Sequence, residues 1–105
     1  GEKAPSGPRF TSDEEIGLRI LYAMNMTREV KPEVMPAMPS GHENARLVRF
    51  EEWKKEVGER VLLDDEKKVD VLARKILGGL RKKRAMDAAK SVDGNFVYSL
   101  GHYDV

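Results

Sequence analysis

Apolar residues recur at spacings of three and four along three stretches of the chain, which places them on one side of an α-helix. These residues are Ile16, Ile20, Leu21 and Met24, then Phe50, Trp53, Val57 and Val61, then Val69, Leu72, Ile76 and Leu80. Before the first stretch, Thr11 or Ser12 can act as an N-cap, with Glu14 or Glu15 three positions later. The pattern therefore predicts a first helix at about 13–25 and two further helices.

The second helix follows the alternating segment "RLVRF" at 46–50, which is rich in β-favouring residues. This segment predicts a short strand that leads directly into the helix. Trp53 lies in register with the other apolar residues of the helix, which favours burial in the core. A tryptophan can also stack on a ligand, so both interpretations are kept.

The third helix carries most of the basic residues. Asp64 or Asp65 can cap its start, and basic residues gather near its end, where they suit the helix dipole. Its basic residues share the side opposite the apolar stripe. That side consists of Lys67, Lys68, Val71, Arg74, Lys75, Gly78 and Lys82.

Gly78 and Gly79 interrupt this helix with two residues of low helix propensity. Together they lower its stability by about 2 kcal/mol relative to two alanines. The pair indicates either a kink or tight crossing with another helix, or a place where Gly78 lets a partner such as a phosphate approach the helix backbone.

The remaining segments predict a loop and a hairpin. Residues 27–45 hold three prolines and a Ser-Gly pair without periodicity, which indicates a long loop. Val34, Met35 and Met38 are candidates to attach it to the core. Asp93-Gly94 favours a type I′ turn between strands near 87–92 and 95–100. Residues 1–12 resemble a disordered linker or an expression-derived remnant, and 101–105 a tail, so the predicted domain is 13–100.

Composition adds an uneven distribution of charge. Residues 1–65 carry ten basic and thirteen acidic side chains, whereas residues 66–105 carry nine and five. All nine basic residues of the second part lie between Lys67 and Lys90, with only Asp70 and Asp87 among them. This concentration suits an anionic partner, although a solvated helix face has the same pattern.

Composition also excludes several classes of protein. The 105 residues contain no cysteine and two histidines, so neither a disulfide framework nor a zinc site is expected. No apolar run is long enough for a membrane span or a signal peptide. We therefore expect one soluble, cytoplasmic domain that is nucleoid-associated if it binds DNA, with no metal, cofactor or membrane partner.

The predicted order is helix, long loop, short strand, helix, basic helix and hairpin. This is the order of a winged helix-turn-helix domain, an α+β fold that is mainly helical. In such a domain two helices support the third, which enters a major groove, and the hairpin forms a wing beside it.

Three segments, "RFEEW", "LARKILGGLRKKRAM" and "DGNFVYSL", resemble the winged-helix domain C-terminal to RepA-like AAA ATPase helicases of plasmids and phages. The residues that carry this resemblance are Val48, Trp53, Arg74 to Leu80, Phe96 and Val97. It spans about residues 13–100. The basic run Arg81–Arg84 departs from the more usual Gly-containing turn, and no ATPase motif is present. The resemblance implies a DNA- or partner-binding accessory domain of a larger replication protein.

Three hypotheses follow for function. The first is binding of DNA, expected to be double-stranded, through the third helix and the wing. The candidate contacts are Lys67, Lys68, Arg74, Lys75, Gly78, Arg81, Lys82, Lys83, Arg84, Lys90 and Asn95. The second is a protein-interaction module of a replication or regulatory complex, favoured by the acidic second helix. An enzyme has little support, because no phosphate-binding loop or catalytic constellation is present.

Overall fold

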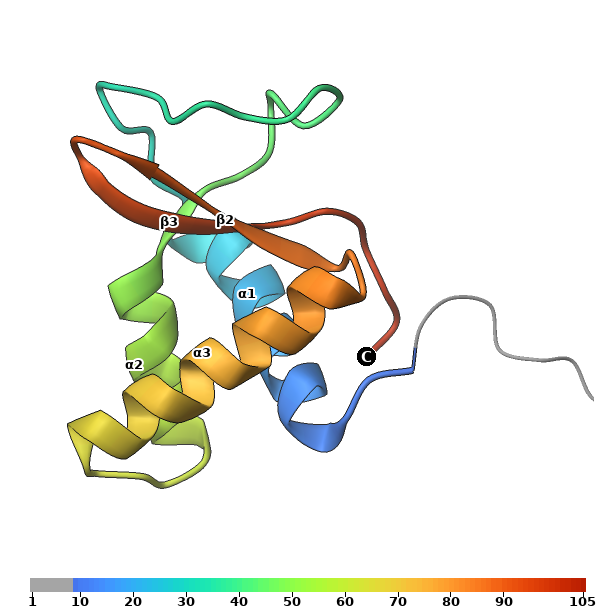
Figure 1. The fold of residues 1–105 in the computed structure, drawn as a ribbon, viewed down its shortest axis with the longest axis vertical. Helices are drawn as coiled ribbons and strands as arrows, with labels where there is room; N and C mark the ends of the chain where they lie inside the picture. Colours follow the sequence, from blue (N-terminus) through green and yellow to red (C-terminus); the bar gives the residue numbers. More distant parts are fainter. Residues whose placement is uncertain (1–8) are drawn as a thin grey trace, which may run out of the picture.

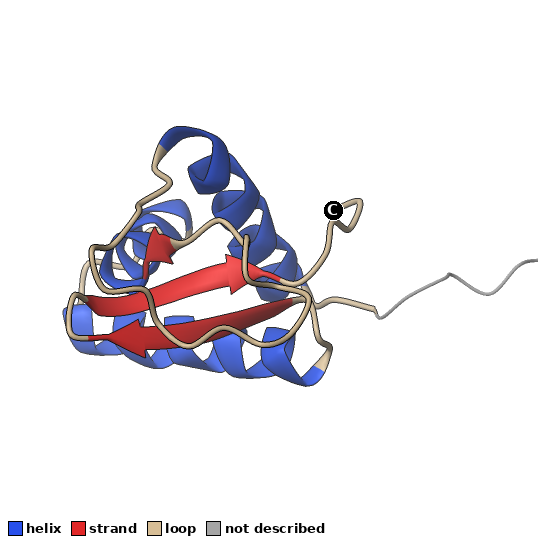
Figure 2. Ribbon diagram, turned by 90° about the horizontal axis from the view of Figure 1, so that it is seen from above, coloured by secondary structure: helices blue, strands red, loops and turns tan. Residues whose placement is uncertain are grey.

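The structure, a computed structural model, describes residues 9–105. It is an α+β fold of three helices and a three-stranded antiparallel sheet with strand order β1-β3-β2. Helices pack on one side of the sheet (Figures 1 and 2). The elements are α1 (Ser12–Thr27), β1 (Val48–Arg49), α2 (Phe50–Arg60), α3 (Glu66–Lys82), β2 (Met86–Ser91) and β3 (Gly94–Ser99). The three predicted helices, the short strand and the hairpin are therefore present.

Two helix starts have the predicted caps. Thr11 and Glu14 form a capping box: the Glu14 backbone N–H donates to the Thr11 hydroxyl, and the Thr11 N–H donates to the Glu14 carboxylate at 2.9 Å. At α3, the Asp65 carboxylate accepts from the backbone N–H groups of Lys67 and Lys68. These local bonds satisfy donors that the first turn of a helix leaves free.

The core lies between the helices and the inner side of the sheet. Trp53 is fully buried, and its indole N–H donates to the Gly17 carbonyl oxygen at 3.0 Å. The predicted core position of Trp53 is thus confirmed. A Cβ at Gly17 would lie 2.6 Å from Ile76 Cγ2, so this glycine allows α1 to approach α3 closely.

The hairpin is confirmed, but its turn is shifted from the prediction. Strand pairing brings Ser91 opposite Gly94, so Val92 and Asp93 form the loop. Gly94 has a φ of 130°, whereas Val92 and Asp93 do not have positive φ. The predicted type I′ turn centred on Asp93-Gly94 is therefore wrong, because such a turn needs positive φ at both central residues.

Residues 28–47 cross the outer side of the sheet (Figures 1 and 2). An isolated bridge joins Val30 to Leu47, and Met38 packs against buried Leu47, Phe96 and Tyr98. The side chains of Val34 and Met35 are about half exposed, contrary to the prediction that they attach the loop to the core. The loop covers the sheet, and so it leaves the outer face of α3 open.

Residues at both ends of the described chain return to α1. The Tyr22 hydroxyl donates to the Gly101 carbonyl oxygen at 3.1 Å and accepts from the Tyr103 N–H at 3.0 Å. Phe10 packs edge-on against Tyr103. Residues 101–105, predicted as a tail, are thus attached to the fold, while most of the predicted linker lies outside the described residues.

Candidate nucleic-acid interface

The outer face of α3 carries a row of exposed positions at spacings of three and four. Lys68, Val71, Lys75, Gly78 and Lys82 form this row, and all are exposed. It lies opposite the stripe that packs into the core, so burial of that stripe forces the row into solvent. We call Lys68, Lys75 and Lys82 the lysine stripe. Neighbouring lysines of the stripe are about 10 Å apart along the helix axis.

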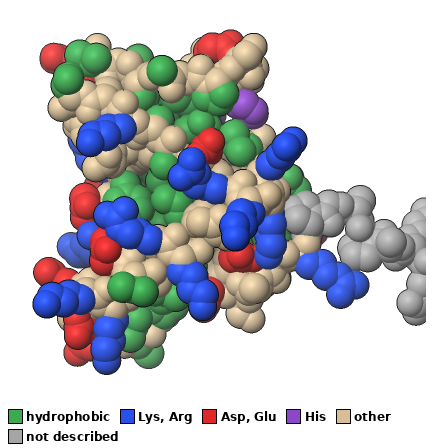
Figure 3. Space-filling view, in the orientation of Figure 1, with side chains coloured by type: hydrophobic (Ala, Val, Ile, Leu, Met, Phe, Trp, Pro, Cys, Tyr) green, Lys and Arg blue, Asp and Glu red, His purple; other side chains and the backbone are tan. Residues whose placement is uncertain are grey.

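The lysine stripe has no ion-pair partner within residues 9–105. Lys67, beside its start, is likewise unpaired within this range. Figure 3 shows Lys and Arg side chains distributed over the side of the molecule on which α3 lies in Figure 1. The positive charges of Lys67 and the lysine stripe are therefore available to an anionic partner.

Two arginines next to the lysine stripe are held by carboxylates. Arg74 Nε lies 2.9 Å from Asp70 Oδ2, and its guanidinium lies over the Phe50 ring at 5.1 Å. Arg81 Nε lies 2.8 Å from Asp87 Oδ1 on β2. Both side chains remain more than half exposed. The hydrogen bond from Arg74, followed by that from Lys54, lowers the pKa of Asp70, so this carboxylate stays ionised.

A shallow groove joins α3 to the hairpin. It has a volume of about 210 Å³, and Arg74, Lys90 and Asn95 line it together. Lys90 and Asn95 are paired across β2 and β3, which places both at the groove from the hairpin side. Three of the predicted site residues, from two separate parts of the sequence, thus border one surface feature.

In the basic run Arg81–Arg84 at the end of α3, Lys83 is partly buried, whereas the other three residues are exposed. Lys83 turns inward, and its ammonium binds the buried Glu14 carboxylate. Burial raises the pKa of Glu14, but the bonds from Lys83 and Thr11 lower it by more, and the net pKa lies below its ordinary value. Lys83 therefore connects α3 to α1 and does not contribute to the exposed face.

Arg84 is exposed and has a φ of 57°, the left-handed position that usually takes glycine. Around it the Arg84 N–H donates to the Arg81 carbonyl oxygen and the Ala85 N–H to that of Leu80, which completes a Schellman motif. Left-handed backbone costs a non-glycine residue about 1–2 kcal/mol. An arginine therefore occupies a site where glycine is the more stable choice.

The two adjacent glycines of α3 have different surroundings. A Cβ at Gly79 would lie 2.1 Å from Glu14 Oε2, so Gly79 makes room for the Glu14–Lys83 pair. At Gly78 no described atom beyond its own helix lies within 4 Å of that position. α3 also runs through this point as one helix. A tight crossing is thus excluded at Gly78 among the described residues.

Arg49 on β1 is a basic residue near the hairpin that sequence reasoning missed. Its guanidinium lies 5.4 Å above the Phe96 ring, and Nη1 donates to the Asp93 carbonyl oxygen at 3.1 Å. Pairing of β1 with β3 brings it there. Only the alternating segment at 46–50 gave a signal for this strand, and nothing in it specified which strand it would pair with.

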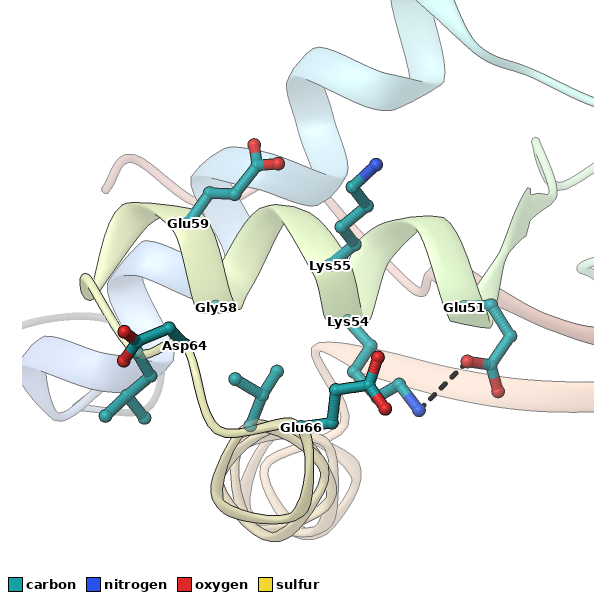
Figure 4. Close-up of a pocket in the computed structure, with 9 residues that line it drawn as sticks. Glu51, Lys54, Lys55, Gly58, Glu59, Asp64 and Glu66 are labelled. Carbon is teal, nitrogen blue, oxygen red and sulfur yellow. Dashed lines mark ion pairs between the residues drawn. The ribbon is translucent and has the colours of Figure 1, made fainter.

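The hollow between α2 and the start of α3 is lined by charged residues of both signs (Figure 4). It has a volume of about 470 Å³. Its charged residues are Glu51, Lys54, Lys55, Glu59, Asp64 and Glu66. Lys54 is held by Glu51 at 2.9 Å and by Asp70 at 3.2 Å, and these bonds raise its pKa despite its partial burial. This hollow therefore offers little to an anion.

Residues 9–105 give no indication of a metal site or of a membrane-spanning helix. Across residues 9–105, no group of three His, Cys, Asp or Glu side chains is placed to hold a metal ion. The described helices also include none with the length and apolar character needed to cross a bilayer. Comparison of the chain with protein-family models, curated proteins and solved structures gives no match.

Proposed function

We propose that this chain is a winged-helix domain that binds double-stranded DNA through the outer face of α3 and the β2–β3 hairpin. The order of elements and the sheet order β1-β3-β2 support the fold assignment. The observation that carries the functional proposal is the lysine stripe on α3, which has no ion-pair partner within the described part of the chain and lies beside the hairpin groove.

The proposed contacts divide by type. The lysine stripe and Lys67 neutralise phosphates. This neutralisation releases counterions from the DNA and supplies most of the binding affinity. Arg74, Lys90 and Asn95 border the groove, where a strand of the duplex backbone passes between helix and wing. Val71, 68% exposed within the basic row, is available to contact a thymine methyl group if α3 enters a major groove.

A protein-interaction module is the second candidate, and exposed apolar residues at the hairpin tip favour it. Val92 is 85% exposed, and the Val34 N–H donates to Asp93 Oδ2 at 2.8 Å, which brings half-exposed Val34 beside the same turn. Contact with another subunit of a replication protein would cover this tip. The link to replication rests on the sequence resemblance alone.

Fluorescence anisotropy with a labelled 20-bp duplex, together with a heparin column, separates the two candidates. We expect salt-dependent retention on heparin and an affinity that falls roughly 10²- to 10³-fold between 50 and 200 mM salt, as for about four to six phosphate contacts. Absence of duplex binding, or binding with no salt dependence, would contradict the DNA proposal.

A further inference from the structure

Gly78 has no structural explanation within the described fold, unlike Gly79 beside it. The position of its missing side chain is open, since no described atom beyond its own helix lies within 4 Å of it. Glycine lowers helix stability relative to alanine, and alanine would fit without a clash. The space above the helix backbone is therefore the property that distinguishes this position.

That space lies between two lysines that have no ion-pair partner among residues 9–105. Lys75 is three residues before Gly78 and Lys82 four residues after it, so both project from the same face, about one turn away on either side. Two surface hollows, of about 500 and 400 Å³, both border Gly78 and Lys82. Two of the carboxylates lining these hollows are already engaged, Glu14 by Lys83 and Asp87 by Arg81. Asp13, in the first turn of α1, also lines the larger hollow.

We propose that Gly78 seats a phosphate group of the DNA backbone directly against α3, with Lys75 and Lys82 holding it from either side. This inference rests on the proposed function and assigns the closest approach between helix and nucleic acid. Mid-helix N–H groups are already bonded within the helix, so glycine contributes space and the two ammonium groups contribute the attraction. A methyl group at this position would push the phosphate away from both lysines.

Gly78→Ala and Gly78→Leu test the inference. Gly78→Ala should make the protein more stable while it weakens DNA binding, and Gly78→Leu adds more bulk at the same position. We expect Gly78→Ala to raise the Tm by about 4–8 °C and to weaken duplex binding roughly tenfold, as for loss of a charge-assisted contact. Gly78→Leu should weaken binding further. It should also reduce the magnitude of the salt slope by about one, because the single phosphate that both lysines hold is lost. Ala23→Leu, at an exposed position of α1, is the control for added bulk and should leave affinity unchanged.

Double-mutant cycles identify the group that binds. Gly78→Ala combined with Lys82→Ala should cost less than the sum of the two single changes, whereas its combination with Lys68→Ala, farther along the helix, should be additive. If wild type binds the duplex and Gly78→Leu binds equally well, the phosphate seat is wrong and the proposed function stands. Weaker binding with an unchanged salt slope would also overturn the seat, because it indicates contact with a base. No salt-dependent binding by wild type would overturn both.

Discussion

The outer faces of α2 and α3 are both solvated helix surfaces, but their charges are arranged differently. α2 has four acidic and three basic residues, and α3 has two acidic and six basic ones. On and around α2, opposite charges meet: Lys54 contacts Glu51 and Asp70, and Arg28 contacts Glu56 at 3.0 Å. On α3, the lysine stripe has no such contacts among the described residues.

This contrast bears on whether the basic residues of α3 form a binding surface or only a solvated helix face. A face that serves only for solvation can combine both signs, as α2 does, and its pairs cost little to maintain. The lysine stripe instead repeats one charge at every second turn, and no carboxylate of the described chain forms an ion pair with it. Like charges at this spacing are unfavourable in the free protein, especially at low salt, and an anion relieves them. The difference supports a binding role for α3 specifically.

The largest effect on DNA binding is expected from removal of the lysine stripe, which is what distinguishes the surface of α3 from that of α2. Replacing Lys68, Lys75 and Lys82 together with alanine should weaken duplex binding roughly 10²-fold or more and reduce the magnitude of the salt slope by about two, because Lys75 and Lys82 share one phosphate and Lys68 holds another. Alanine keeps helix propensity high, and the three positions are exposed, so the fold should persist. Anisotropy at several salt concentrations measures the first effect, and circular dichroism verifies the second.

A variant with three alanines elsewhere controls for net charge. Lys31, Lys55 and Arg60 are exposed basic residues outside α3 and the hairpin, and their replacement removes the same charge. Binding should stay within about threefold of wild type, because exposed charges beyond the Debye length are largely screened. An equal loss in both triple variants would indicate that net charge, and not the lysine stripe, governs binding.

A smaller effect is expected at the C-terminal ends of the same two helices. Leu62 after α2 and Arg84 after α3 both have left-handed backbone, with φ of 60° and 57°. Arg84→Gly and Leu62→Gly should each raise the free energy of unfolding by roughly 1 kcal/mol or less, because relief of strain exceeds the added freedom of the unfolded chain. Denaturant unfolding measures this shared gain.

Only Arg84→Gly should also weaken duplex binding, by roughly three- to tenfold, because it alone removes a cation next to the α3 face. Leu62→Gly provides the matched comparison at a helix end with the same geometry. If Arg84→Gly binds DNA as tightly as wild type, Arg84 has no part in the interface and its strained position needs another explanation.

Local patterns predicted much of the fold. Helical spacing located all three helices, the capping residues located two of their starts, and Trp53 was correctly placed in the core. The turn position was wrong because Asp-Gly chemistry was assumed to decide it. The pairing of Ser91 with Gly94 placed the positive φ one residue after the loop instead.

Contacts between distant segments were not predictable from periodicity. Lys83 belongs to the basic run by sequence, yet a buried carboxylate 69 positions away binds it. The role of Gly79 depends on the same carboxylate, and the place of Arg49 depends on which strand β1 joins. These features depend on how α1 and β3 pack against the rest of the fold, and no single stretch of sequence encodes that packing. The exposure of the lysine stripe, by contrast, followed directly from the apolar stripe opposite it.

Chemical-shift mapping tests the central claim most directly, because it observes α2 and α3 in one sample. An ¹⁵N-labelled chain would be titrated with an unlabelled 20-bp duplex. We predict that the largest amide shifts fall on residues 67–84 and 89–96, with little change across 51–60. Shifts centred on α2, or confined to the apolar hairpin tip at Val34 and Val92, would contradict DNA binding through the outer face of α3.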